Sequence, residues 1–255
     1  MSMEVKILHI YPDLMSLYGS YANLSVLRRY LEAMGCTVTV DALRPGETPA
    51  PLTSYDFLFL GAGTERAADY ALTQLRPWGD ALCKAAAEGL PMLFAGTAME
   101  LLGKSITAAD GTETAGLGLA DFTAVRQDRR IVGDVFGPTA LFDEVVVGFM
   151  NKCALIHGVE TPLLTACTMG FGNDAQGGAE GYHKDNVFAS ELTGPLLVKN
   201  PRLLEKTVVQ AIYARRGQPL PAEKPSFPYA QAGYAITAEQ LRLRLRLEKE
   251  NASKK

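Results

Sequence analysis

The sequence predicts an α/β domain built on a doubly wound, mostly parallel sheet with helices on both faces. Short runs that are apolar at every position alternate with longer segments of helical periodicity, and glycine often stands where the two meet. Strands that are apolar on both faces need cover on both sides, and parallel neighbours need crossover helices to connect them. A sheet covered by helices on both faces satisfies both requirements.

The first 95 residues carry the clearest alternation. A compact apolar strand is expected over residues 5–10, and a helix follows over about 22–34, where Leu24, Leu27 and Leu31 recur at helical spacing before Gly35 ends it. Three further strands are expected over residues 37–40, 55–60 and 91–95, with one long helix over 66–88 before the last of them. Ligands in such sheets bind beyond the carboxyl ends of the strands, so the loops after these strands are the first candidate sites.

The middle of the chain is less regular. Short β-rich runs over residues 122–125, 131–135 and 144–148 predict strands added to one edge of the sheet. A turn region is then expected around five glycines, at positions 170, 172, 177, 178 and 181. An apolar run over 186–189 and a helix over about 201–215 are expected to close the domain.

The last segment has a different composition. Residues 1–217 are expected to form one domain, and residues 218–255 a proline-rich linker followed by a charged helix. Thr237 has the residue type of an N-cap, and Glu239 lies in the first turn that such a cap would begin. The pattern therefore predicts a solvated helix over 237–250.

Composition excludes several classes of function. The formal net charge is -3, with 25 basic and 28 acidic residues, so the basic excess needed to bind a nucleic-acid backbone is missing. Apolar runs stay below the roughly 18 residues of a membrane span, and no secretory signal pattern is evident. A cytoplasmic protein is expected. The four cysteines form no C-x-x-C pair, so no metal site and no cofactor are predicted.

Several motifs support a more specific interpretation. Residues 9–19 read HIYPDLMSLYG directly after the first expected strand. This segment resembles the opening motif of class I glutamine amidotransferases of the CobB/CobQ type, most closely the GatD glutaminase subunits that work with a MurT ligase; the family's next residues, Asp-Arg-Gly, are Ser20, Tyr21 and Ala22 here. Five more similarities follow in the family's order, at residues 57–63, 91–95, 148–151, 170–173 and 194–201.

The resemblance assigns catalytic positions that this chain does not fill. The family uses a cysteine thiolate on a tight strand-to-helix turn and a histidine base. Gly96 stands at the nucleophile position and Thr193 at the base position. Glycine has no side chain, and a threonine hydroxyl is no base near neutral pH. Glycine also relieves the backbone strain of such a turn. The paired change favours natural divergence over an engineered knockout, and it predicts that glutaminase activity has been lost.

A binding pocket could persist without catalysis. Such a pocket would offer backbone donors and one cation to a small carboxylate or amide ligand. Its candidate residues are Gly61, Gly63, Thr64, Gly96, Thr97, Ala98, Arg130, Asn151 and Thr193. Arg130 resembles a basic residue near the family's glutamine site and could clamp a carboxylate. The alternative is that it belongs to a solvated charged run over 126–130.

Two classes of function follow. In the first, the chain is a non-catalytic subunit that binds a MurT-like ligase, or another ATP-dependent synthetase, in cell-wall precursor amidation. In the second, it is an enzyme with a relocated site, for which Cys153 is the candidate thiol although none of the three histidines is an evident base. A cobyric-acid-synthase-like role is a further alternative. It is disfavoured because no ATP-binding synthetase domain is expected in this sequence.

Overall fold

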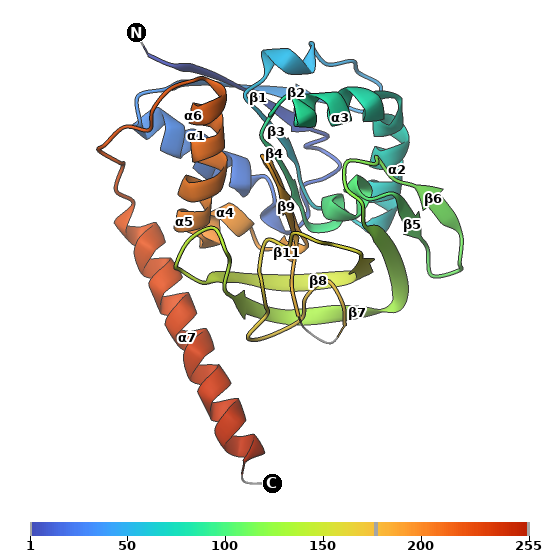
Figure 1. The fold of residues 1–255 in the computed structure, drawn as a ribbon, viewed down its shortest axis with the longest axis vertical. Coiled ribbons are helices and arrows are strands. Elements are labelled where there is room, and N and C mark those ends of the chain that lie inside the picture. The colour runs from blue at the N-terminus through green and yellow to red at the C-terminus, as the bar shows by residue number, and fades with distance from the viewer. Residues whose placement is uncertain (1, 176–177, 254–255) are drawn as a thin grey trace.

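A computed structural model of the protein, which describes residues 2–175 and 178–253, has a six-stranded main sheet. The strand order is β2-β1-β3-β4-β10-β9, and every neighbouring pair is parallel except the antiparallel edge pair of β10 and β9 (Figure 1). The bounds are Glu4–Ile10 for β1, Thr37–Leu43 for β2, Phe57–Leu60 for β3, Met92–Ala95 for β4, Tyr182–Lys184 for β9 and Val187–Ser190 for β10. The predicted fold class is confirmed.

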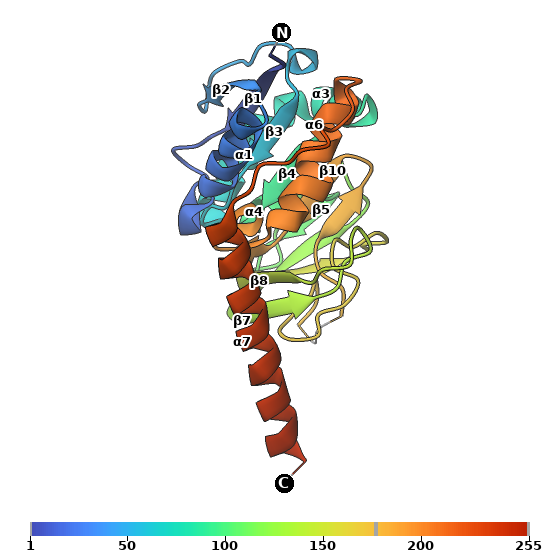
Figure 2. The same cartoon turned by 90° about the vertical axis from the view of Figure 1, so that its left-hand side faces the viewer.

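Helices cover both faces of this sheet (Figure 2). Leu58 and Leu60 of β3 belong to the apolar cluster that includes α2 and α3, whereas Phe57 and Phe59 belong to the cluster of α1 and α6. Burying one such side chain contributes about 1.5–3 kcal/mol, so the all-apolar strands stabilise both layers. The helices are α1 (Ala22–Ala33), α2 (Glu65–Leu75), η3 (Arg76–Trp78), α3 (Gly79–Ala87), α4 (Leu196–Lys199), α5 (Pro201–Leu203), the π-helical η5 (Leu204–Val209) and α6 (Gln210–Arg215).

The long helix expected over residues 66–88 is in fact two helices. The α-helix α2 ends at Leu75, a 3-10 turn follows, and α3 starts at Gly79. The break coincides with Pro77, which has no backbone N–H and whose ring is incompatible with a continuous helix. The start of α2 is fixed by Thr64, whose hydroxyl oxygen accepts a hydrogen bond from the Ala67 amide at 3.1 Å.

The β-rich middle of the chain forms a second sheet, which corrects the expectation of strands added to the main sheet. Its order is β11-β8-β7-β5-β6. The expected strands over 122–125 and 131–135 are one long strand interrupted by a register shift between Arg126 and Ile131, and it pairs with β8 over nearly its whole length. The bounds are Ser105–Thr107 for β5, Glu113–Ala115 for β6, Thr123–Gly137 for β7, Val146–His157 for β8 and Leu192–Thr193 for β11.

The glycine-rich region folds back on the second sheet. A Cβ at Gly170, whose φ is +84°, would collide with the Asp134 carbonyl oxygen of β7, so glycine permits this close approach. Asn173 then clamps Gly181 through two hydrogen bonds of 2.9 and 3.0 Å. Gly177, also expected in this turn region, lies outside the described residues.

The C-terminal helix is longer than predicted. Helix α7 (Pro228–Ala252) begins at Pro228, a residue assigned to the linker, because proline is favoured in the first helical turn. Thr237 is therefore inside the helix, where its hydroxyl donates to the Gly233 carbonyl at 2.8 Å. The Tyr234 hydroxyl donates to the Val145 carbonyl at 2.7 Å, which anchors α7 to the second sheet. Ala238 and Leu241 continue the contact with the second sheet, and the last turns of the helix project from the body (Figures 1 and 2).

Within residues 2–175 and 178–253, every helix is too short or too polar to span a bilayer.

Candidate functional site

Gly96 lies at the turn that follows β4. It opens the 3-10 helix η4 (Gly96–Leu102) with a φ of +64°, the left-handed region that disfavours residues with a Cβ. The tight strand-to-helix turn expected at this position is therefore present, and glycine adopts it without strain. The residues that follow it are buried, with Thr97 9% exposed and Ala98 fully buried in the core.

Thr193 lies beside Gly96. A Cβ built on Gly96 would be 3.6 Å from the Thr193 methyl carbon, although Gly96 follows a strand of the main sheet and Thr193 belongs to the second sheet. The Thr193 hydroxyl donates to the Phe149 carbonyl at 2.9 Å, so its proton is held by the backbone of β8. The fold thus brings together the two positions that the sequence motifs pair as nucleophile and base.

Ala62 fills the space next to Gly96. The same Cβ would lie only 2.6 Å from the Ala62 Cβ and 3.3 Å from its Cα, closer than non-bonded carbons approach. The crevice between Ala62, Gly96 and Thr193 has about 170 Å³ of empty space and is too narrow to admit a water-sized sphere. Sequence reasoning missed this methyl group. Its signal was Ala62 itself, because the family's strand motif that residues 57–63 resemble ends in three consecutive glycines.

The loop after β3 is held by hydrogen bonds to other parts of the protein. Thr97 accepts a hydrogen bond from the Gly63 amide at 2.9 Å and donates to the Gly63 carbonyl at 3.0 Å. The Ala62 amide donates to the Ser20 hydroxyl oxygen at 3.1 Å. A Cβ at Gly61 would collide with the Met15 carbonyl oxygen. The backbone donor of Gly63, a predicted pocket residue, and that of its neighbour Ala62 are therefore engaged by side chains of the protein.

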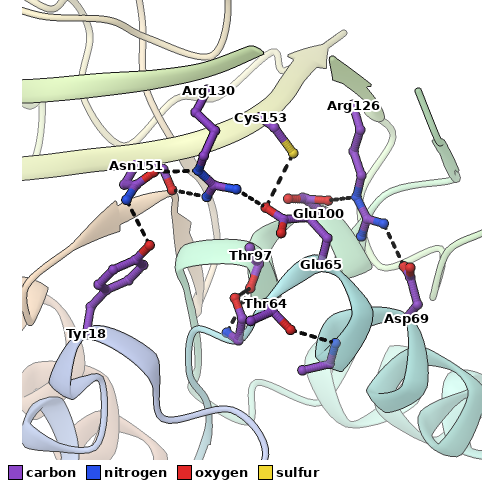
Figure 3. A network of polar contacts seen from close by, with 12 residues as sticks. Tyr18, Thr64, Glu65, Asp69, Thr97, Glu100, Arg126, Arg130, Asn151 and Cys153 are labelled. Atoms are coloured by element: carbon purple, nitrogen blue, oxygen red, sulfur yellow. Dashed lines mark hydrogen bonds and ion pairs between the residues drawn. The ribbon is translucent and has the colours of Figure 1, made fainter. Parts of the chain in front are cut away.

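Arg130 and Asn151 meet in a polar network above this loop (Figure 3). Arg130 donates to the Asn151 side-chain oxygen at 2.6 Å, to the Asn151 carbonyl at 2.9 Å and to Glu65 at 2.7 Å. Asn151 in turn donates to the Tyr18 hydroxyl at 2.8 Å. Thr64, next to Glu65, serves as the helix cap described above. Arg130, the cation predicted to clamp a ligand carboxylate, is therefore already paired with the Glu65 carboxylate.

Cys153 points into the same network, but its environment opposes thiolate formation. Burial, together with the negative charges of Glu65 and Glu100, raises the pKa of Cys153 to about 12. The thiol donates to a Glu65 oxygen at 3.4 Å, and the side chain belongs to a residue that is only 8% exposed. A nucleophilic cysteine requires the opposite shift.

The three histidines lie elsewhere. Burial lowers the pKa of His9 to about 4, and its ring packs on Phe59 with centroids 5.2 Å apart. His183 stacks on Phe188 on the edge strand pair of the main sheet. His157 ends β8 and is exposed. Among the interactions of the described residues, none joins a histidine to Cys153. In those ranges, no group of three potential metal ligands forms either.

A buried arginine corrects the expectation for the charged run over 126–130. Arg126 is only 8% exposed, and its guanidinium donates to Glu100 at 2.7 Å and to Asp69 at 2.8 Å (Figure 3). Burial raises the pKa of Glu100, and the adjacent guanidinium opposes that shift. Sequence periodicity could not reveal this pair because its members come from η4 and β7.

A second buried ion pair lies behind Thr193. Lys152 is 2% exposed, and its ammonium donates to Glu191 at 2.6 Å, to the Gly172 carbonyl at 2.7 Å and to the Asn173 carbonyl at 3.2 Å. Glu180 lies close by, where burial raises its pKa to about 7. One cation therefore stabilises two buried acids and two backbone carbonyls.

Comparisons with known proteins agree with the motifs. The model of the CobB/CobQ-like glutamine amidotransferase domain matches residues 6–201. The lipid II isoglutaminyl synthase (glutamine-hydrolyzing) subunit GatD of Staphylococcus aureus (strain N315) is 30% identical over 221 residues, covering 85% of this chain and 87% of its own length. The same subunit of Streptococcus pneumoniae (strain ATCC BAA-255 / R6) is 28% identical over 219 residues, covering 84% and 83%.

A solved structure shares the fold. The structure of PurLQS from Thermotoga maritima superposes with a TM-score of 0.51 at 14% sequence identity, and the match covers 84% of this chain and 97% of that chain.

Proposed function

The chain belongs to the family of CobB/CobQ-like glutamine amidotransferase domains, and from that premise we propose that it is a GatD-like subunit whose glutaminase site has been lost. In this proposal it acts in the cytoplasm as a binding or regulatory partner of a MurT-like ligase, in amidation of a cell-wall precursor. The relatives at 28% and 30% identity bear the name of a synthase subunit, which supports a role inside a complex.

One observation carries the proposed loss of activity. Gly96 keeps the left-handed backbone of a nucleophile turn, yet Ala62 stands 2.6 Å from the place of its missing Cβ. A cysteine at position 96 would need that volume for its own side chain, and a tetrahedral intermediate would need still more. The residues at 62, 96 and 193 form one consistent set. Gly96 and Thr193 supply neither a thiol nor a base, and the Ala62 methyl group fills the space that a nucleophile would need.

The alternative of a relocated glutaminase site is disfavoured by the surroundings of Cys153. Its pKa of about 12 leaves only a negligible thiolate fraction at neutral pH, and the adjacent Glu65 carboxylate repels the anion further. The Arg130 guanidinium, which would orient a substrate carboxylate, already contacts Glu65 at 2.7 Å. In our proposal a small carboxylate or amide ligand binds there only after it displaces Glu65.

The partner is tested by capture from the native cell. The tagged chain is expected to bring down a Mur-ligase-like or other ATP-dependent synthetase at equal molar yield, identified by mass spectrometry of the purified complex. A tagged unrelated protein of the same cell serves as the control. Recovery of the chain without any synthetase, but with a tightly bound small molecule near Arg130, would reject the partner role in favour of a small-molecule binding or enzymatic one.

A further inference from the structure

Helix α7 has two apolar faces. One faces the second sheet, where Ala238 and Leu241 are buried against Phe136 and Val147, with Leu245 packed at the edge of the same cluster. This face recurs at spacings of three and four residues, as expected of a helix packed on a protein body. It accounts for the anchored part of α7.

The opposite face carries a second stripe. Ile236, Leu243 and Leu247 are 60%, 41% and 50% exposed, and Gln240 lies between the first two. Successive spacings of four, three and four residues are those of a coiled-coil seam. At about 100° per residue, these positions lie on the side of the helix away from the buried face. The stripe lies alongside the anchored stretch of α7 and continues toward the end of the helix that projects from the body (Figures 1 and 2).

We propose that this stripe pairs with the same stripe of a second copy of the chain, with the two α7 helices antiparallel. In that register Ile236 meets Leu247 of the second copy, and Gln240 meets Leu243. Two-fold symmetry generates each contact twice. The pairing covers the exposed leucines and isoleucine, and it explains why a helix that already buries one apolar face on the protein body carries a second.

The charged residues beside the seam favour a second copy of the chain as the partner and an antiparallel direction. Glu239 and Arg246 flank the seam on one side, and the antiparallel register places Glu239 of each copy opposite Arg246 of the other. Neither residue has an ion-pair partner among residues 2–175 and 178–253, so both are available. The chain is thus complementary to itself across this seam.

The parallel alternative fits less well. It would stack Gln240 on Gln240 and bring Glu239 opposite Arg244. The Arg244 guanidinium already contacts Asp134 at 2.8 Å and Glu248 at 3.0 Å, so it has less to gain from a further acid.

The test measures the mass of the full chain by light scattering and sedimentation velocity across a micromolar dilution series. A dimer, with twice the 27.5 kDa mass of the chain, is expected at the upper concentrations. Leu243→Asp should weaken dimerisation at least about a hundredfold, because the side chain is buried twice per dimer. Lys249→Asp, on another exposed face of α7, is the matched control and should leave the dimer unchanged.

A charge exchange tests the register. Glu239→Arg or Arg246→Glu alone puts like charges face to face twice and should weaken the dimer about tenfold. The double exchange should restore it, since each pair is again of opposite charge. A chain that stays monomeric at the highest concentration, a dimer indifferent to Leu243→Asp, or a double exchange no better than the single ones would each overturn the proposal.

Discussion

Replacing Lys152 with methionine is expected to lower the free energy of unfolding by about 3–5 kcal/mol, measured by urea denaturation at neutral pH. The methionine keeps the apolar stem but removes the ammonium that contacts Glu191 at 2.6 Å and two backbone carbonyls. Glu191 and Glu180, both buried, would then lack their cation. This loss exceeds that of any surface substitution because water cannot replace the missing charge.

Two variants control this prediction. Adding Glu191→Gln to Lys152→Met should recover part of the loss, since a neutral amide needs no cation. Lys224→Met removes a lysine whose ion pair with Glu205 is partly exposed, and it should cost less than about 1 kcal/mol. A Lys152→Met protein as stable as the Lys224→Met protein would show that the buried pair contributes nothing to the fold.

Restoring the catalytic residues is expected to fail unless Ala62 is also changed. Gly96→Cys with Thr193→His should leave the protein unlabelled by an electrophilic glutamine analogue. The new Cβ would be 2.6 Å from the Ala62 Cβ, and the left-handed backbone adds strain, so the pair should also lower stability by roughly 2 kcal/mol or more. Adding Ala62→Gly removes the collision and should raise the labelling rate at least about tenfold.

The single variant Ala62→Gly tests the effect of the added space alone, without a nucleophile. It opens the crevice without supplying a thiol at position 96, so it should remain unlabelled, and mass spectrometry should place any label of the triple variant on the introduced cysteine. Equal labelling of the double and triple variants would show that the Ala62 methyl group does not obstruct the site. A folded triple variant that stays unlabelled would mean that more of the pocket has been remodelled.

Local patterns were enough to predict the first four strands of the main sheet, although not its edge strand β9, which follows the glycine-rich turn. The apolar run of β1, the helical spacing in α1 and the glycine-bounded strand β3 each carry their own signal within a few residues, and the structure confirms them. The second sheet was not predictable in this way, because β7 and β8 are defined by pairing with each other across a register shift. Pro228 was misassigned because proline marks linkers and helix starts alike.

The site shows a similar division. The sequence motifs singled out Gly96 and Thr193, and the fold places them side by side. The Ala62 methyl group, the Glu65 carboxylate on Arg130 and the burial of Arg126 depend on distances between separate elements, which no spacing in the sequence encodes. The sequence shows Ala62 between two glycines, but only the structure shows that its methyl group lies against Gly96.

Ammonia release from glutamine tests the proposed loss of the glutaminase site most directly. It should be measured on the purified chain alone and on the complex with its captured synthetase. We expect no release above the buffer blank in either sample, while added ammonium salt still supports amidation by the partner. Release that the partner stimulates and that survives Cys153→Ala would contradict the account, because the fold would then contain a working glutaminase site that these residues do not explain.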